Sequence, residues 1–409
     1  MKTISDFKIL FFSRILRLFS YGLLSIILVN YLAEIGISKT QIGLLLSLTL
    51  VGDVVVSLWI TLNADSFGRK RMLMISSLLI VLAGVLFFIT NNFLLLLLAA
   101  IVGVISPSGN EVGPFLSIEQ AALSQITPDR SRTRIFTWYH LCGFFATAIG
   151  SLVTGFILHF QLGHGVSQLE SYHAMIFLYA AIGLLLGLLF TLLSPKIEAP
   201  VRSSVKFSQK YFGLHNSRSK VFKLSSLFAV DAFGGGFVLQ SIMAYWFYIR
   251  FQADPAVLGG VFFGMNILAG FSGLLAARLA SRIGLINTMF FTHLPSNFLL
   301  ILVPLMPNLS LAILVLLLRS AISQMDVPTR QSYTMAVVDP DERSAAAGIT
   351  NIARTLGAVA SPVLAVPLMA KTSLLNVPFF LAGGIKIFYD LMLYRWFKTV
   401  KPVEEKNEK

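Results

Sequence analysis

Long apolar stretches recur along the whole chain and are separated by short polar segments. Stretches such as 73–89 are continuously apolar and do not alternate at period two, which favours membrane-spanning helices over the strands of a barrel. Each is about as long as the roughly 20 residues that a helix needs to cross a bilayer. We predict twelve transmembrane helices, at residues 9–34, 41–63, 71–90, 93–122, 133–160, 172–194, 221–250, 255–281, 286–306, 309–337, 344–369 and 375–400.

The composition agrees with this pattern, because hydrophobic residues make up 56% of the chain and charged residues only 12%. A soluble domain carries roughly 25% charged residues, and a soluble protein this apolar would expose large apolar patches. In a bilayer the surplus apolar side chains form the outer, lipid-facing surface, and each helix satisfies its own backbone hydrogen-bonding groups. We therefore predict an all-α membrane protein.

The net charge of +13 is typical of nucleic-acid-binding proteins, but the placement of the basic residues argues against that class. With the N-terminus in the cytoplasm, nearly all of them fall on that side, as the positive-inside rule describes. Topology and attraction to anionic lipid account for the charge, so we expect membrane lipids and no nucleic acid as partners. We predict a multi-pass inner-membrane protein with both termini in the cytoplasm. The basic residues on that side include Arg69, Lys70, Arg71, Arg130, Arg132, Arg134, Lys196, Arg202, Lys206, Lys398 and Lys401.

A polar, basic segment lies at the middle of the chain and suggests two bundles joined by a cytoplasmic linker. The two halves also resemble each other: Gly68 and Gly284 follow corresponding stretches, and Phe19 with Gly22 matches Phe233 with Gly236. Parallel halves of this kind rock against each other around a central site in transporters. The predicted parts are an N-terminal six-helix bundle at 1–194, a linker at 195–220, a C-terminal six-helix bundle at 221–400 and a cytoplasmic tail at 401–409.

The loop after the second apolar stretch carries a recognisable motif, Asn-Ala-Asp-Ser-Phe-Gly-Arg-Lys-Arg at 63–71. Its Asp65, Gly68, Arg69 and Lys70 match the signature loop of the major facilitator superfamily, which the chain resembles in its twelve-span layout as well. The resemblance implies two pseudo-symmetric six-helix bundles, alternating access, and a cytoplasmic gate at this loop. A basic loop that only sets topology is the alternative. We favour the gate, because Asp65 and Gly68 contribute nothing to topology.

Ionisable residues inside the predicted spans cost roughly 2.5–3.5 kcal/mol each on insertion scales, so they must face a cavity or a partner. The resemblance implies that the first, fourth, seventh and tenth spans line a central cavity, and most of these residues fall on those spans. They are Arg14, Arg17, Asp53, Glu111, Glu119, Asp231, Arg319, Asp326, Arg330 and Arg354.

Depth in the bilayer, at a rise of about 1.5 Å per residue, sorts the charges. Asp231 and Arg319 fall near mid-depth and are the best candidates for the central site, with a structural ion pair as the alternative. Three further charges fall in the cytoplasmic third of the bilayer and belong to the predicted substrate and proton pathway. Asp53 belongs to this pathway as well and is either a buried protonated acid or a proton site. These three are Arg17, Glu111 and Asp326.

Three other charges lie nearest the cytoplasmic mouth of the predicted cavity. Glu119 and Arg330 form gate salt bridges or contact the ligand, and we expect them in the gate. Arg14 is expected to reach the membrane interface with its charged end.

Breaks in the helices are expected where proline and glycine interrupt the apolar stretches, because proline removes a helix hydrogen bond. The segments 106–114 and 326–328 are such places, and irregular backbone at membrane depth is tolerated only inside protein or beside a water-filled cavity. His293 precedes a proline in the ninth span. It can titrate near neutral pH, with a plain packing role as the alternative.

Motifs of soluble enzymes, phosphate-binding loops and metal clusters are missing from the sequence, so we expect neither an enzyme nor a bound cofactor or metal. The leading hypothesis is a monomeric secondary transporter that moves a small polar or anionic solute, coupled to protons. A proton-driven exporter of drugs or amphipathic compounds is the alternative, supported by the 34 phenylalanines. The fifth span lacks the Gly-Pro pair of the antiporter motif, and this absence weakens the exporter alternative. A membrane-embedded enzyme or receptor is a third class.

Overall fold

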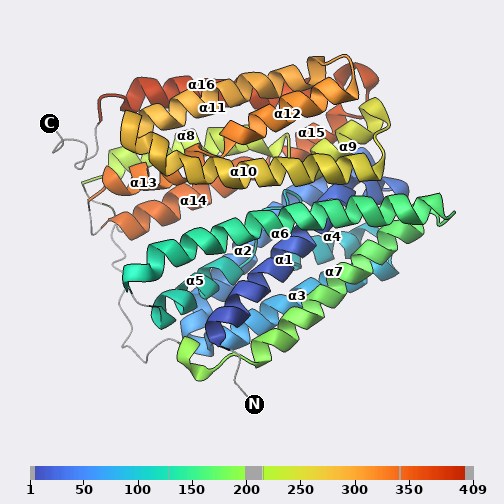
Figure 1. The fold of residues 1–409 in the computed structure, drawn as a ribbon, viewed down its shortest axis with the longest axis horizontal. Helices are drawn as coiled ribbons and strands as arrows, with labels where there is room; N and C mark the ends of the chain where they lie inside the picture. Colours follow the sequence, from blue (N-terminus) through green and yellow to red (C-terminus); the bar gives the residue numbers. More distant parts are fainter. Residues whose placement is uncertain (1–4, 128, 199–213, 215, 340–341, 401–409) are drawn as a thin grey trace. The chain divides into compact units, whose positions relative to one another are not determined.

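The computed structural model describes residues 5–127, 129–198, 214, 216–339 and 342–400. This part of the chain is helical and contains no β-strand (Figure 1). The helices of the first half are α1 (Asp6–Glu34), α2 (Lys39–Phe67), α3 (Arg69–Ile89), α4 (Phe93–Val102), α5 (Phe115–Ile126), α6 (Asp129–Gly163), α7 (Gln168–Thr191) and the short η1 (Pro195–Ile197). Those of the second half are α8 (Arg218–Gly236), α9 (Gln240–Phe251), α10 (Pro255–Ile283), α11 (Leu285–Leu302), η3 (Val303–Leu305), α12 (Leu309–Ser323), α13 (Asp326–Ala336), α14 (Arg343–Val359), α15 (Pro362–Leu368), η4 (Thr372–Leu374) and α16 (Val377–Phe397).

These helices confirm the predicted all-α fold. Within the described residues, eleven helices are long and apolar enough to cross a membrane. The remaining predicted span, 93–122, is divided into α4 and α5 by a non-helical segment, 103–114, where the sequence predicts a break. Proline and glycine in that segment prevent a continuous helix.

Local sequence signals set several helix ends. Ser38 and Gln41 form a capping box at the start of α2, and Ser167 and Glu170 form another at the start of α7. Gly68 precedes α3 with φ of 101°, and Gly284 precedes α11 with φ of 84°. Side chains other than glycine rarely adopt this backbone conformation. The two glycines that the sequence pairs by position therefore make the same kind of turn.

Contacts among the helices divide the chain into two compact units. Unit 1 comprises 1–203 and 239–266, and unit 2 comprises 204–238 and 267–409. In unit 1, α1 packs against α6, α7 and α9, and α3 packs against α7. The segment 239–266 belongs to unit 1 by these contacts, whereas the sequence places it in the C-terminal half. The division of the chain at the central linker stays a prediction.

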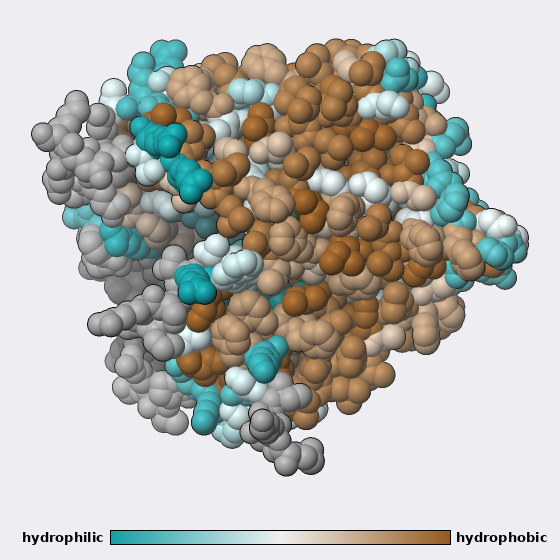
Figure 2. All heavy atoms as spheres, in the orientation of Figure 1, coloured by the Kyte–Doolittle hydropathy of each residue, from teal (hydrophilic) through white to brown (hydrophobic). Residues whose placement is uncertain are grey.

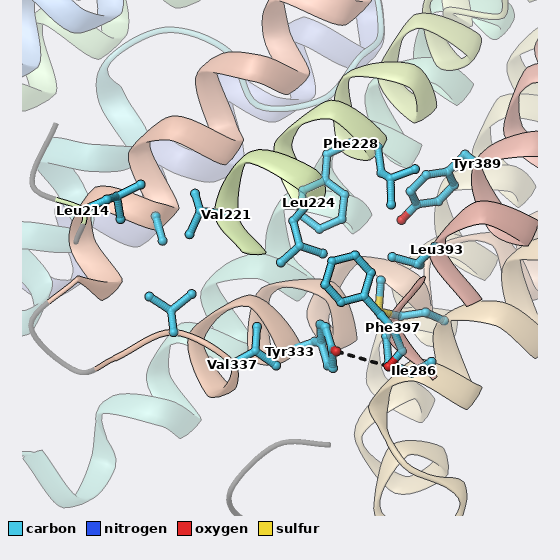
Figure 3. Packing of buried hydrophobic residues seen from close by; sticks show 14 residues of the cluster. Leu214, Val221, Leu224, Phe228, Ile286, Tyr333, Val337, Tyr389, Leu393 and Phe397 are labelled. Carbon is cyan, nitrogen blue, oxygen red and sulfur yellow. Dashed lines mark hydrogen bonds between the residues drawn. The ribbon is translucent and has the colours of Figure 1, made fainter. Parts of the chain in front are cut away.

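In unit 2, α8 packs against α14 and α16, and α11 packs against α12, α13 and α16. Buried apolar side chains from α8, α11, α13 and α16 meet in one cluster (Figure 3). In it the hydroxyl of Tyr333 donates a hydrogen bond of 2.8 Å to the carbonyl of Val400, and the hydroxyl oxygen lies 3.5 Å from the carbonyl oxygen of Phe397. This cluster holds together the ends of the helices that carry the charged residues described below.

Many large apolar side chains point outward, among them Leu62, Leu94 and Phe156, each more than 60% exposed. On the face drawn in Figure 2, hydrophobic residues cover broad continuous areas of helix surface. An aqueous surface rarely carries apolar areas of this extent, whereas a lipid-facing surface requires them.

Candidate functional site

A cluster of charges in unit 1 joins α1 to the segment around α5. Arg17 Nε lies 2.9 Å from Glu111 Oε1, and Arg17 Nη2 lies 2.7 Å from Glu119 Oε2. Arg14 Nη1 lies 2.5 Å from Glu111 Oε2. Arg17 and Glu119 are fully buried, and Arg14 is 4% exposed. Two arginines and two glutamates therefore neutralise each other inside the unit.

Neighbouring groups complete this unit 1 cluster. Ser13 Oγ donates a hydrogen bond of 2.8 Å to Glu119 Oε1, and the Tyr139 hydroxyl donates to the other oxygen of Glu119. The guanidinium of Arg14 lies over the Tyr139 ring at 4.2 Å, and that of Arg17 over the Phe115 ring at 4.4 Å. Such contacts stabilise a buried cation. Among the buried polar atoms of these residues, Arg14 Nε alone has no hydrogen-bond partner within the described part of the chain.

The prediction that Arg14 reaches the membrane interface is wrong. Its helix turns it inward, because Arg14 and Arg17 are three residues apart and share a face of α1. Glu111, in the non-helical segment, accepts hydrogen bonds from both arginines. The ion pair with Glu111 compensates the burial of the Arg14 guanidinium.

The non-helical segment 103–114 is held by side chains of the surrounding helices. The Tyr179 hydroxyl donates to the Val104 carbonyl at 2.6 Å, and Thr147 Oγ1 donates to the Gly109 carbonyl at 3.2 Å. Asp53 Oδ1 accepts the backbone N–H of Gly113 at 2.5 Å. Backbone groups left unpaired by the break thereby find partners, as membrane depth requires.

The signature loop binds the segment that follows α7. Arg69 Nε lies 2.8 Å from Asp65 Oδ1, within the same loop. The Glu198 carboxylate accepts the backbone N–H groups of Arg69, at 2.6 Å, and Lys70, at 3.3 Å. A carboxylate at the first turn of α3 satisfies unpaired donors and suits the positive end of the helix dipole.

Further contacts fasten this loop to the same segment. Arg69 Nη1 donates to Gln125 Oε1 at 2.9 Å and to the Ile197 carbonyl at 3.1 Å. Lys70 Nζ donates to the carbonyls of Thr191, at 2.7 Å, and Leu193, at 2.8 Å. All these partners belong to unit 1. The carboxylate beside the Arg69 guanidinium is thus Asp65 of its own loop, and the gate role of the loop stays a prediction.

A second cluster of charges lies in unit 2 and is centred on Asp231 of α8. Lys386 Nζ of α16 lies 2.6 Å from Asp231 Oδ1. Arg330 Nη1 of α13 lies 3.1 Å from Asp231 Oδ2 and 3.0 Å from Asp326 Oδ2. The Arg330 guanidinium also lies 5.4 Å from the Phe228 ring, which belongs to the apolar cluster in Figure 3. All four charged residues are buried.

Histidine and a further carboxylate extend this unit 2 cluster. His293 Nδ1 of α11 lies 2.7 Å from Asp390 Oδ1 of α16, and His293 Nε2 lies 3.7 Å from Asp231 Oδ1. Asn297 Nδ2 donates to Asp390 Oδ2 at 2.8 Å. His293 thus stands between two carboxylates from two different helices.

Two arginines of unit 2 lie near the same carboxylates but are less completely bound. The Nε atoms of Arg319 and Arg354 are buried and have no hydrogen-bond partner among the described residues. Both guanidinium groups lie within electrostatic range of Asp231 and Asp326. Both side chains are partly exposed as a whole. Among the arginines of this cluster, these two have a buried Nε without a partner in the described part of the chain.

The charges of the unit 2 cluster do not cancel. Four cations face three carboxylates, which leaves one excess positive charge when His293 is neutral and two when it is protonated. The cations are Arg319, Arg330, Arg354 and Lys386, and the carboxylates are Asp231, Asp326 and Asp390.

The structure groups the predicted site residues differently from the sequence analysis. Arg17 and Glu111 of the predicted pathway join Glu119 of the predicted gate in one cluster. Asp231 and Asp326 of the pathway join Arg330 of the gate in the other. The ion pair considered for Asp231 and Arg319 is not formed among the described residues, because Arg330 and Lys386 occupy the Asp231 oxygens. Their roles in transport stay predictions.

Lys386 and Asp390 are missing from the predicted site. Both are ionisable residues inside the predicted span 375–400 and lie four residues apart, on one face of a helix. The criterion used for the other spans, an ionisable residue inside a predicted span, also identifies Lys386 and Asp390. Tyr139 also contacts a buried charge, but a tyrosine in an apolar stretch gives no comparable signal.

The part of the chain that the structure describes contains no group of three or more histidine, cysteine, aspartate or glutamate side chains placed to hold a metal ion. The charged side chains of the two clusters form ion pairs and hydrogen bonds with one another.

Comparisons with known proteins agree with this architecture. An uncharacterized membrane protein of Saccharomyces cerevisiae (strain ATCC 204508 / S288c), YJR124C, is 31% identical to this chain, and the match covers 97% of this chain and 94% of that protein. The crystal structure of the nucleoside transporter NupG is similar with a TM-score of 0.72 at 14% identity, over 97% of this chain and 100% of that one. A D-xylose-proton symporter is similar with a TM-score of 0.70 at 13% identity, over 95% of each chain.

Likenesses at these low identities show the shared fold. The family model described as Major Facilitator Superfamily matches residues 10–362, which is most of the chain. The resemblance inferred from the signature loop and the twelve-span layout is confirmed. The protein is thus a multi-pass membrane protein and belongs to the Major Facilitator Superfamily.

Proposed function

We propose that this protein is a secondary active transporter that carries a small anionic solute across the inner membrane by alternating access, coupled to protons. The observation that carries the proposal is the cationic excess of the unit 2 cluster, with the unpartnered Nε atoms of Arg319 and Arg354. Membership of the Major Facilitator Superfamily supports membrane transport as the general activity.

An uncompensated charge inside a protein is unfavourable unless a partner or water stabilises it. In the unit 2 cluster the carboxylates are already held by Arg330, Lys386 and His293. A ligand that brings negative charge to Arg319 and Arg354 compensates the excess. Guanidinium groups suit this task, because their planar donors match carboxylate and phosphate oxygens. The solute class that fits is a small organic or inorganic anion.

Proton coupling is supported by the titratable groups beside these arginines. His293 contacts Asp390 and faces Asp231. Histidine is the side chain whose charge ordinarily changes between about pH 5 and 8. A proton bound there changes the charge of the cluster that contains Arg319 and Arg354. Proton and anion binding in one place is the minimum that a symporter needs.

The remaining assignments follow from the sequence and the family. The positive-inside distribution of charge supports cytoplasmic termini, and the signature loop with Asp65, Gly68, Arg69 and Lys70 is assigned to the cytoplasmic gate. The neutral unit 1 cluster is assigned to holding the broken helix in place. We expect the protein to act as a monomer surrounded by lipid.

The experiment is uptake into proteoliposomes with an imposed inward proton gradient. A panel of labelled mono-, di- and tricarboxylates, phosphate and sulfate is compared with nucleosides and sugars. We expect uptake of an anion that depends on the gradient and is lost in Arg319→Gln. Arg250→Gln, at the exposed end of α9, is the matched control and retains uptake. Uptake of neutral solutes alone, or equal uptake in both variants, contradicts the proposal.

One observation favours the alternative of a proton-driven exporter of drugs or amphipathic compounds. Unit 2 contains a pocket of about 610 Å³ between α8 and α14, lined mainly by apolar side chains such as Phe222, Ile349, Ile352 and Leu356. An apolar pocket of this size suits a hydrophobic compound. Overproduction that raises cellular tolerance to hydrophobic toxins, with loss of that tolerance in Ile352→Asp, supports this alternative.

A further inference from the structure

We infer that His293 is the proton-carrying residue, and that its protonation strengthens the binding of an anion at Arg319 and Arg354. This inference rests on the proposed function, because it concerns the anion site of the unit 2 cluster. It adds the residue that takes the proton and the direction in which proton and anion influence each other.

The positions of the ring nitrogens of His293 define where the proton is added. Nδ1 lies 2.7 Å from Asp390 Oδ1, and a carboxylate oxygen accepts, so Nδ1 carries the hydrogen in the neutral ring. Nε2 then has a free lone pair, and it lies 3.7 Å from Asp231 Oδ1. Asn297 holds the second oxygen of Asp390 at 2.8 Å and keeps that carboxylate in position. A hydronium ion therefore gives its proton to the Nε2 lone pair and is released as water.

Protonation at Nε2 alters the contacts of Asp231. Lys386 Nζ lies 2.6 Å from the same Oδ1 atom that His293 Nε2 faces. A protonated His293 therefore shares this oxygen with Lys386 and weakens its hold on the ammonium group. The excess positive charge of the cluster rises from one to two at the same time. Both changes favour an anion beside Arg319 and Arg354, because Coulomb interactions are strong where water is scarce.

The other titratable and charged groups of the unit 2 cluster come from α12, α13 and α16, which pack against α11, and from α8 and α14. They are Asp231 on α8, Arg319 on α12, Asp326 and Arg330 on α13, Arg354 on α14, and Lys386, Tyr389 and Asp390 on α16. The arginines do not lose their protons in proteins. Asp231 and Asp326 are held by Arg330. Asp390 is the one competing carboxylate, since its ion-pair partner among the described residues is His293 itself.

Coupling of this kind has a measurable signature that a purely structural histidine lacks. If a proton strengthens anion binding, the anion must by linkage strengthen proton binding by the same factor. Couplings between sites in proteins are commonly about 5- to 150-fold. We expect the affinity for a suitable anion to rise at least about fivefold as the pH falls from about 8 to about 5, the range in which histidine titrates.

The experiment measures anion binding to the purified full-length protein in nanodiscs, by calorimetry and by the shift in thermal unfolding. Sulfate and ethane-1,2-disulfonate serve as probes, since their own charges do not change in this pH range. Wild type is expected to bind at least one probe more tightly at low pH. His293→Gln is expected to bind with an affinity that is independent of pH and close to that of wild type at high pH. His164→Gln, an exposed histidine of unit 1, is the matched control and keeps the wild-type profile.

A second variant provides an independent test if His293→Gln does not fold. Asp390→Asn keeps the histidine and removes its anionic neighbour, so the rise in affinity is expected at a lower pH than in wild type. If the affinity of wild type and that of His293→Gln rise equally at low pH, this inference about His293 is overturned. The proposal that the solute is an anion is not affected by that result. Binding that Arg319→Gln does not weaken, or no binding of either probe at any pH, overturns the anion site as well.

Discussion

Lys386 on α16 and Asp231 on α8 form a buried ion pair with 2.6 Å between Nζ and Oδ1. The two residues are far apart in the sequence and belong to helices that pack against each other in unit 2. Arg330 approaches the other oxygen of the same carboxylate. One carboxylate of α8 thus connects three helices, and the pair is a good place to test how the cluster is built.

Neutralising Lys386 alone is expected to destabilise the protein more than neutralising both partners. Lys386→Met leaves Asp231 with one cation fewer, and breaking a buried pair by removing one partner costs about 3–5 kcal/mol. The double variant Lys386→Met with Asp231→Asn removes both charges and restores part of the loss. Thermal unfolding in detergent measures the difference, and Lys371→Met, at an exposed position, is the matched control. Additive losses in the double variant would show that the pair does not act as a unit.

Removing the Tyr139 hydroxyl is expected to lower stability modestly without changing transport. Tyr139→Phe deletes one hydrogen bond to the buried Glu119 and keeps the ring that lies beside Arg14. A hydrogen bond to a charged group contributes about 1.5–3 kcal/mol. Thermal unfolding and proteoliposome uptake are measured on the same preparation. A large loss of uptake at unchanged stability contradicts the structural role that we assign to the unit 1 cluster.

Truncating Glu198 is expected to loosen the start of α3. Glu198→Ala removes the acceptor of the Arg69 and Lys70 backbone N–H groups, and losing a cap of this kind costs about 0.5–2 kcal/mol. Hydrogen exchange followed by mass spectrometry should rise over the first turn of α3. Glu34→Ala, at the exposed end of α1, is the control and leaves exchange at α3 unchanged. Protection of α3 that is the same in Glu198→Ala and wild type would refute the capping role.

Substituting Asp53 tests whether it is the predicted proton site or mainly holds the non-helical segment. Asp53→Asn keeps an oxygen that can accept the Gly113 N–H, whereas Asp53→Ala does not. If Asp53 mainly holds the non-helical segment, the asparagine variant keeps proton-driven uptake and the alanine variant loses it together with stability. We expect this result, because the contacts of Asp53 are with the Gly113 backbone and Ser57. Loss of proton dependence in Asp53→Asn, with uptake along a gradient retained, would instead identify a proton site.

The helices are predictable from the sequence because hydropathy is a local property. Each predicted span coincides with a helix or with a pair of helices, and the break in 93–122 follows from its prolines and glycines. The turn at Gly68 is equally local, since a positive φ depends on the residue itself. Secondary structure follows more directly from composition in a bilayer than in water, because an apolar stretch in lipid satisfies its backbone groups mainly as a helix.

The partners of the buried charges are harder to predict. Arg17, Glu111 and Glu119 are recognisable as costly charges in the sequence, but their pairing depends on how α1 packs beside α5. Asp231 is paired with Lys386 because α8 packs against α16, which no spacing along the chain reveals. The sequence therefore indicates which buried charges need a partner, and the packing of the helices determines which residue that partner is.

The central claim is that an anion and a proton move together through the unit 2 cluster. The most direct measurement uses proteoliposomes that contain a trapped pH-sensitive dye and no initial pH gradient. Adding the transported anion outside is expected to acidify the interior of wild-type vesicles, and to leave that of Arg319→Gln and His293→Gln vesicles unchanged. Anion entry into wild-type vesicles without acidification, or equal acidification in all three, contradicts the account.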